Sequence, residues 1–286
     1  MEYRPRLSKE EYQLILDHRG VNKEPHFKSS NLPKILLFDI ETAPLIAEMW
    51  SPWGDAIRVL RDSNIICWSA KWLLDDKMYN ASLKKKEIIK GDDERITRSL
   101  WQLFDEADIL IAHNLNKFDK KVAQTRFFKY DLKMPSHYQK IDTLVTLKKE
   151  FKITYNRLDY VARNFLGYKG KLQTEKYLWH SVTGDIVNDI KPDMDAMQRM
   201  QDYCDQDVRV LEDVYMRLRP YITNHPNLAL WIGSDERICK ACGNNHFTQI
   251  NDYTTLVNVY EAFRCNNCGS VHRSRKPIKN SNISLR

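Results

Sequence analysis

The chain has 286 residues, of which 42% are hydrophobic and 29% charged, so it can bury a sizeable core as one large domain or a large one with a small one. The formal net charge of +7 suits a polyanionic partner, although many unrelated proteins share such a surplus. No apolar run approaches the roughly 20 residues that cross a bilayer, and no apolar stretch follows the first charges. We therefore exclude a membrane or secreted protein and expect a cytoplasmic one.

Taken in chain order, residues 1–33 are predicted to be an appendage with one short helix, because Ser8 to Glu11 have capping-box spacing. Residues 34–40 form a continuous apolar run that is typical of a central strand buried on both faces. Further strands are predicted at 65–72, 78–83 and 108–113 from the same kind of pattern.

Helical spacing of apolar residues predicts helices at 92–106, 117–130, 155–166 and 195–218. Strands that come first and then alternate with helices indicate an α/β layered domain over residues 34–222, with a mixed central sheet flanked by helices. The composition changes near residue 225, and residues 223–286 are short, polar and cysteine-bearing. We expect a second, small module there.

Two acids lie at the end of the first predicted strand, in the segment Leu37-Phe38-Asp39-Ile40-Glu41-Thr42. Side chains two apart on a strand share a face, so Asp39 and Glu41 are predicted to point the same way while Phe38 and Ile40 pack behind them. Acids are costly to bury unpaired, and a cation would compensate them. The alternative is an ordinary strand-end acid with a lysine partner.

Two later segments carry further acids. Asp119 closes His113-Asn114-Leu115-Asn116-Lys117-Phe118-Asp119 at the start of a predicted helix, where an acid also interacts well with the helix dipole. Tyr203 and Asp207 are four apart on a predicted helix and share one face, which is also what an ordinary surface pair would do. Each segment alone leaves both readings open.

In this order, the three segments resemble the three motifs of the DEDD superfamily of 3′–5′ exonucleases, which have a ribonuclease H-like fold. Asp39-Ile40-Glu41 matches the first motif, Asn114 with Phe118-Asp119 the second, and Tyr203-x-x-x-Asp207 the third in its tyrosine subclass. No histidine takes the place of Tyr203, as it would in the sister subclass. The residue pattern Tyr-Cys-x-x-Asp-Val is similar to the third motif in the proofreading domains of family B DNA polymerases. The resemblance covers residues 34–222.

The resemblance implies a role for each acid. Asp39 would bridge two Mg²⁺ or Mn²⁺ ions, Glu41 and Asp207 would complete the first metal site, and Asp119 would hold the second. Tyr203 would orient the attacking water. We also predict substrate contacts for residues beside these motifs and in the following loop, namely Thr42, Asn114, Phe118 and Trp53, the last by stacking on a base or, alternatively, by packing within its loop.

Four of the six cysteines form two Cys-x-x-Cys knuckles, each followed by glycine: Cys239, Cys242, Cys265 and Cys268. Four thiolates close a tetrahedral Zn²⁺ site, so this zinc should be structural. Disulfides are the alternative, and His246 could replace one ligand. The basic residues that follow, including Arg273 and Arg275, suggest a grip on nucleic acid, while a structural cap or a protein-docking module remains open.

The function predicted from these observations is a stand-alone, two-metal 3′–5′ exonuclease acting on the 3′ end of single-stranded nucleic acid, with a C-terminal zinc ribbon. DNA is favoured over RNA as the substrate only by the residue pattern of the third motif. The alternatives are an exoribonuclease and a catalytically silent nucleic-acid-binding adaptor. The 64 residues after position 222 cannot hold a polymerase domain, so a proofreading role would need a separate replication or repair partner.

Overall fold

The structure is a computed structural model that describes residues 32–51, 53–168, 177–185, 188–233 and 236–280. The helix predicted near Ser8 lies outside these ranges. The chain divides into two compact units, Pro33–Leu218 and a second unit that contains Arg219–Arg286. Each unit is described by itself below. Within the described residues, no helix combines the length and the apolar character that crossing a bilayer requires.

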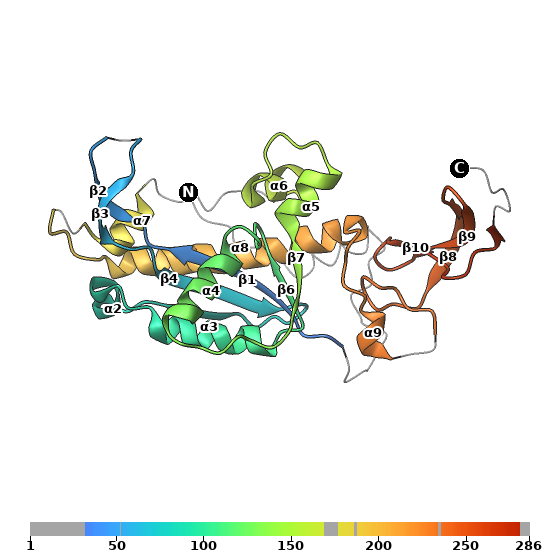
Figure 1. Ribbon diagram of the computed structural model, residues 1–286, viewed down its shortest axis with the longest axis horizontal. Helices are drawn as coiled ribbons and strands as arrows, with labels where there is room; N and C mark the ends of the chain where they lie inside the picture. The colour runs from blue at the N-terminus through green and yellow to red at the C-terminus, as the bar shows by residue number, and fades with distance from the viewer. Residues whose placement is uncertain (1–31, 52, 169–176, 186–187, 234–235, 281–286) are drawn as a thin grey trace. The chain divides into compact units, whose positions relative to one another are not determined.

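The first unit is built on a five-stranded sheet (Figure 1). Its strands have the order β5-β4-β1-β6-β7, and β1 occupies the centre. The neighbours β4 and β5 run antiparallel to their partners, whereas β6 and β7 continue from β1 in parallel, so the sheet is mixed. The strand bounds are Ile35–Thr42 for β1, Ile65–Trp72 for β4, Tyr79–Ser82 for β5, Ile109–Ala112 for β6 and Gln139–Asp142 for β7.

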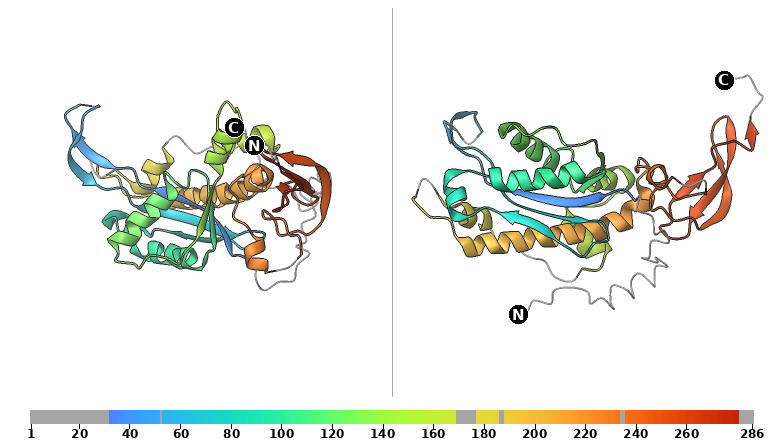
Figure 2. Two further views of the ribbon diagram at one scale, coloured as in Figure 1. Left: turned by 45° about the vertical axis from the view of Figure 1, so that its right-hand side comes forward. Right: turned by 90° about the horizontal axis from the view of Figure 1, so that it is seen from below.

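Helices cover both faces of this sheet. The helices α3 and α4 lie on one face and the long helix α8 on the other, as the right-hand view of Figure 2 shows. This arrangement confirms the predicted α/β layered fold with a mixed central sheet flanked by helices. The helix bounds are Lys85–Lys90 for α2, Glu94–Glu106 for α3, Asp119–Lys129 for α4, Thr143–Glu150 for α5, Leu158–Phe165 for α6, Leu178–Thr183 for α7 and Met194–Leu218 for α8.

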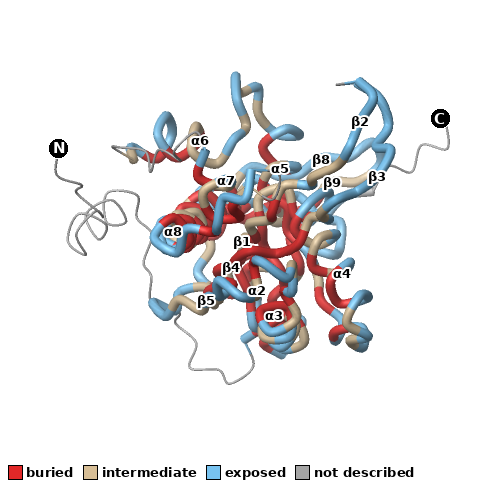
Figure 3. The backbone as a smooth tube through the Cα atoms, turned by 90° about the vertical axis from the view of Figure 1, so that its left-hand side faces the viewer, coloured by how far each residue is buried: buried red, intermediate tan, exposed pale blue. Residues whose placement is uncertain are grey.

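The alternation along β1 separates the core from the acids. Phe38 and Ile40 are fully buried, and the Phe38 ring packs edge-on against Phe104 of α3 with centroids 4.8 Å apart. Asp39 and Glu41 are only half-buried and point to the other face, as predicted. In Figure 3 the central strands and the inner sides of α3 and α8 are buried, which places the core on both sides of β1.

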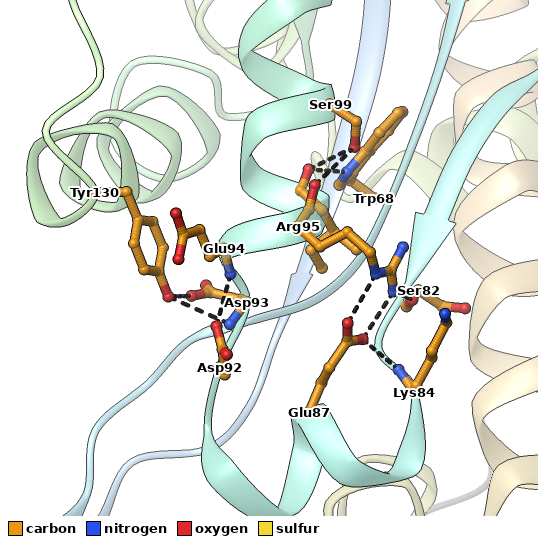
Figure 4. A network of polar contacts seen from close by, with 11 residues as sticks. Trp68, Ser82, Lys84, Glu87, Asp92, Asp93, Glu94, Arg95, Ser99 and Tyr130 are labelled. Carbon is orange, nitrogen blue, oxygen red and sulfur yellow. Dashed lines mark hydrogen bonds and ion pairs between the residues drawn. The ribbon is translucent and has the colours of Figure 1, made fainter.

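A buried acid, Asp93, fixes the position of α4 on the sheet. Its carboxylate accepts the backbone N–H of Ile65 at 2.9 Å and is also paired with Arg126 of α4. Figure 4 shows the Tyr130 hydroxyl directed at the same carboxylate, while Arg95 donates to Glu87 at 2.8 Å beside it. A carboxylate that is buried without partners would destabilise the folded state, and these partners prevent that for Asp93. They hold the helix whose first residue is Asp119.

The segment after β1 differs from the expected loop. It forms a two-stranded antiparallel hairpin of β2 (Ile46–Met49) and β3 (Ala56–Arg61). Trp50 and Trp53 lie in the connection and are 91% and 96% exposed. The prediction missed the hairpin because its apolar residues are exposed on both faces and show no buried face to reveal the strand period.

The second unit contains a short helical part and a small sheet. The 3-10 helix η1 (Arg219–Tyr221) and the helix α9 (Ala229–Ile232) precede it. The spacing between the two cysteine knuckles leaves room for two strands, and the structure has them as β8 (Phe247–Thr254) and β9 (Asn258–Cys265), which pair antiparallel. Two short strands that were not predicted, β10 (Val271–Arg273) and β11 (Lys279–Asn280), also pair with β9.

Candidate active site

The structure brings the predicted acids together from three elements. Asp39 and Glu41 come from β1, Asp119 begins α4, and Asp207 lies on α8, which packs against β1 and β4. Each of Asp39, Glu41 and Asp207 has its pKa raised by burial and then by the charge of at least one other member. We call the four acids Asp39, Glu41, Asp119 and Asp207 the acidic cluster. Like charges held this close need protons or a cation to compensate them.

Asp39 lies at the centre of the acidic cluster. Burial, followed by the charge of Asp119, raises the pKa of Asp39 to about 7. The thiol of Cys204, from α8, donates to the Asp39 Oδ2 atom at 3.4 Å and to its carbonyl oxygen at 3.5 Å. Asp39 is therefore influenced by an acid of α4 and hydrogen-bonded by a thiol of α8.

Glu41 lies at an irregularity in the antiparallel pairing of β1 with β4. Glu41 pairs with Cys67 of β4, but Thr42 pairs with Ile65, so the register shifts between Glu41 and Thr42. Bulges of this kind re-aim side chains and are frequent beside active sites. Burial, followed by the charges of Asp39 and Asp207, raises the pKa of Glu41 well above its ordinary value. The indole N–H of Trp179 donates to Glu41 Oε2 at 3.2 Å and lowers this pKa.

Asp119 is almost completely buried, with 1% of its surface exposed. Burial raises the pKa of Asp119 to about 7, although the backbone N–H groups of Asp119 itself and of Ile40 lower it by hydrogen bonding. Its Oδ1 atom has no hydrogen-bond partner among the described residues. A buried carboxylate oxygen without a donor is a suitable ligand for a divalent cation, which prefers such hard oxygen atoms.

The loop before Asp119 is held by an acid that the sequence did not single out. Asp142, the N-cap of α5, accepts the backbone N–H groups of Asn114 at 3.2 Å and Asn116 at 3.0 Å. Asn114 has φ +84°, a left-handed conformation that asparagine tolerates better than most residues. His113 Nδ1 lies 2.9 Å from Thr143 Oγ1, and its Nε2 atom lies 2.8 Å from the carbonyl oxygen of Asn156.

Tyr203 and Asp207 lie on one face of α8, one turn apart, as predicted. The phenol hydrogen-bonds the Asp207 carboxylate, which lowers the pKa of Asp207. Burial and the charge of Asp39 outweigh this effect and raise the pKa of Asp207 to about 8. Burial and the nearby acids also raise the pKa of Tyr203, so its phenol stays protonated and can donate a hydrogen bond.

The four residues predicted to contact substrate lie around this site or beyond it. Thr42 is half-buried at the end of β1, Asn114 is half-buried in its loop, and Phe118 precedes α4 with 39% of its surface exposed. Trp53 projects from the β2–β3 hairpin and is not packed within a loop. Substrate contact by these residues stays a prediction.

Sequence reasoning missed four residues that contact the acidic cluster or act on it. Trp179 packs against the core and also donates to Glu41. Cys204 is buried and donates to Asp39. Asp142 and Asp159 carried no motif, and Asp159 raises the pKa of Asp207 through its charge. Only Cys204 had a usable signal, since it lies inside the third motif.

In the second unit the four predicted zinc ligands come together (the cysteine cluster: Cys239, Cys242, Cys265 and Cys268). Their sulfur atoms all lie within 4.8 Å of one another, with two pairs 3.6 Å apart, and all six cysteines of the chain are free thiols. A tetrahedral site with Zn–S bonds of about 2.3 Å needs sulfur atoms about 3.8 Å apart, so the cluster fits a zinc ribbon. Among the described residues, no acidic group has its ligand atoms converging as tightly.

A histidine does lie beside the cysteine cluster, but it is not the one considered from the sequence. His272 of β10 has its Nε2 atom 3.1 Å from the sulfur of Cys239. His246 instead uses its backbone N–H to donate to Asn244 Oδ1 at 2.7 Å. The position of His272 is that of an outer partner which orients a metal ligand.

Two arginine side chains of the second unit stack on aromatic rings. Arg273 stacks over Tyr260 at 3.9 Å and Arg237 over Phe263 at 3.7 Å. Such stacking leaves the charge available to a partner while fixing the side chain on the sheet. Arg286 lies outside the described residues.

No protein-family model matches the chain, and no curated protein matches it. Among solved structures it is similar to the family B DNA polymerase of the hyperthermophilic archaeon Pyrobaculum calidifontis, at 18% identity and a TM-score of 0.47. That similarity covers 69% of this chain and 26% of the polymerase chain, so this chain spans about a quarter of the polymerase's length. The function proposed below therefore rests on the residues of the site.

Proposed function

We propose that the chain is a metal-dependent 3′–5′ exonuclease that hydrolyses phosphodiester bonds at the end of a single nucleic-acid strand. One observation carries the proposal: four acids from three distant elements meet beside a protonated phenol, with the pKa of each raised by burial and the pKa values of Asp39, Glu41 and Asp207 raised further by other members. A site that collects buried negative charge at this density has little use except to hold cations. The polarity of attack and the preference for DNA rest on the resemblance of the three motifs.

The acids would hold two Mg²⁺ or Mn²⁺ ions. Asp39 would contact both, Glu41 and Asp207 one of them, and Asp119 the other through its unpartnered Oδ1 atom. When bound, the ions would activate the attacking water and stabilise charge on the leaving oxygen. Asp39, Glu41 and Asp207 are half-buried, whereas Asp119 is buried.

The remaining residues position these groups. The Tyr203 phenol, whose hydrogen is donated to Asp207, would align the attacking water by accepting a hydrogen bond from it, and it would keep its own proton because its pKa is raised. Cys204 would hold Asp39 through its Oδ2 atom. Thr42, Asn114 and Phe118 would contact the terminal nucleotide, and Trp53 would stack on a base. The cysteine cluster would bind a structural zinc, with the basic residues around it supporting the grip on nucleic acid.

Incubation with end-labelled single-stranded DNA and RNA tests the proposal. With Mg²⁺ or Mn²⁺ the strand should shorten stepwise from its 3′ end, and EDTA should prevent this. The relative rates on the two polymers decide between exonuclease and exoribonuclease. Binding without metal-dependent shortening would show instead that the chain is a silent nucleic-acid-binding adaptor, in which the zinc module does the binding.

A further inference from the structure

Trp179 lies between two residues of the proposed catalytic site that come from different elements. Its indole N–H donates to Glu41 Oε2 of β1 at 3.2 Å. Its ring packs edge-on against Tyr203 of α8, with centroids 6.3 Å apart and planes at 73°. One side chain therefore touches a proposed metal ligand with its polar edge and the proposed water-orienting phenol with its apolar surface.

The helix that carries Trp179 is fixed on both sides. Leu178 and Val182 of α7 are buried in the core of the first unit. Arg61, at the end of β3, donates to the carbonyl oxygen of Thr183 at the last turn of α7, at 3.2 Å. The backbone N–H of Asp193 donates to the carbonyl oxygen of Ser181 at 3.0 Å. The indole is thus presented from a braced element, which is what a positioning group requires.

The chemistry of the indole suits this task. Its N–H is a donor only, so it can bond an ionised carboxylate but cannot accept from a protonated one or bind a cation. A glutamate has three rotatable bonds, and a donor at one oxygen selects the rotamer that leaves the other oxygen directed elsewhere. The ring edge against Tyr203 limits the phenol in the same way, since edge-to-face pairs have a preferred geometry.

We propose that Trp179 is a positioning residue that holds Glu41 for metal binding and Tyr203 for alignment of the water. This inference rests on the proposed function, because it assigns the task of orienting two groups of that same site. Outer partners of metal ligands typically change metal affinity or activity by about 10–100-fold when they are removed. Trp179 should therefore affect both the affinity for the metal and kcat.

The test compares Trp179→Phe with Trp101→Phe in the full chain loaded with zinc. Trp101 is a matched control, because its indole N–H also donates to an oxygen, the carbonyl of Lys133 at 2.7 Å, and within the described residues it makes no hydrogen bond to the acidic cluster. Mn²⁺ affinity is measured by calorimetry, with Asp39→Ala as the blank. Trp179→Phe should weaken Mn²⁺ binding by about 10–100-fold and lower kcat on single-stranded DNA at saturating metal, with little change in KM for DNA. Trp101→Phe should match the wild type.

A double-mutant cycle separates positioning from packing. If Trp179 acts through Glu41, Trp179→Phe should have little further effect on Mn²⁺ affinity in a Glu41→Gln background. Benzothienylalanine at position 179 keeps the shape of the indole and removes the N–H, so it replaces Trp179→Phe if that variant fails to fold. Unchanged Mn²⁺ affinity and kcat in a folded variant that lacks the N–H would overturn the inference.

The outcomes also separate this inference from the proposed function. If the wild type binds Mn²⁺ at the acids and cleaves DNA while Trp179→Phe behaves identically, only the role of Trp179 fails. If Mn²⁺ affinity falls in Trp179→Phe but no form cleaves nucleic acid, the positioning of Glu41 stands and the exonuclease proposal fails. If the wild type binds no Mn²⁺ beyond the Asp39→Ala blank, both are wrong.

Discussion

The acidic cluster and the cysteine cluster each gather four potential metal ligands, and they do so in different ways. The cysteines come from two knuckles of one small module, and their sulfur atoms lie within 4.8 Å of one another. The acids come from β1, α4 and α8, and among them only Asp119 is fully buried. The compact set has the form of a closed structural site, whereas the acids are brought together from distant elements, as we propose for a site that also binds a substrate.

The two clusters also differ in what stabilises them without metal. The acids lie in a large domain whose apolar core contains none of them. The burial of that core can offset the repulsion between their charges. The cysteine cluster forms much of the small core of its own module, with Ala241 and Phe247 packed beside it. A metal should therefore serve catalysis in the first case and folding in the second.

The largest expected effect comes from removing a central acid. Asp39→Ala or Asp207→Ala should abolish metal-dependent cleavage, because each removes a ligand of a bound cation, while the zinc content and the fold stay unchanged. Labelled single-stranded DNA with Mg²⁺ and circular dichroism measure the two properties. Asp202→Ala is the matched control, since Asp202 is exposed on the same helix and should be neutral. Full activity in Asp207→Ala would refute the role of the acidic cluster.

Loss of the cysteine cluster should have the opposite pattern. Cys239→Ser should lose the single bound zinc and unfold residues around β8 and β9, because a module this small depends on metal for its stability. Cleavage of a very short substrate should persist, since the acids belong to the other unit. Zinc content by elemental analysis and amide spectra of the module check this. Cys67→Ala should keep the zinc, and an unchanged zinc content in Cys239→Ser would contradict the assignment.

Tyr203→Phe should have a smaller effect than loss of an acid. It removes the hydroxyl that hydrogen-bonds Asp207 but leaves all four carboxylates. Removal of a group that assists proton transfer or aligns water costs about 10²-fold in kcat at the lower end of the usual range. Mn²⁺ affinity should remain close to that of the wild type. A fall in affinity as large as that in Asp207→Ala would show that the phenol acts mainly on the metal site.

The smallest expected effect is a dependence of stability on pH. Asp39 and Asp119 have pKa values of about 7 and Asp207 of about 8, above the value of about 4 in an unfolded chain. Between about pH 4 and 8 the folded state therefore binds more protons than the unfolded state, and the stability of the metal-free protein should fall as the pH rises through this window.

Bound Mg²⁺ should flatten this dependence, because it replaces the protons. Thermal melts at pH 5.5 and 8.0, with and without Mg²⁺, measure it through tryptophan fluorescence, which reports mainly on the first unit because Trp231 is the one tryptophan of the second. A shift of a few degrees corresponds to about 1 kcal/mol for a domain of this size. Asp119→Asn should reduce the pH dependence, and an unchanged slope would show that the acids are not the source.

Local sequence patterns were sufficient for the parts of the fold with a strong period. The central strands β1, β4 and β6 and the helices α3, α4 and α8 could be predicted because each has a continuous buried run or a clear apolar face. The short elements β7, α5 and α7 were missed. They contain few residues, and their conformation depends on neighbours such as Asp142, whose hydrogen bonds run to distant backbone groups.

The sequence by itself determined which atoms are available for chemistry. The alternation on β1 places Asp39 and Glu41 on one face, and the two Cys-x-x-Cys knuckles name four thiolates, because both depend on spacing along a few residues. Only the tertiary structure decided which partners these groups meet. Trp179 reaches Glu41 across 138 positions, Cys204 reaches Asp39 across 165, and His272, not His246, lies against Cys239. Contacts of this kind arise when helices pack on a sheet, and no local period encodes them.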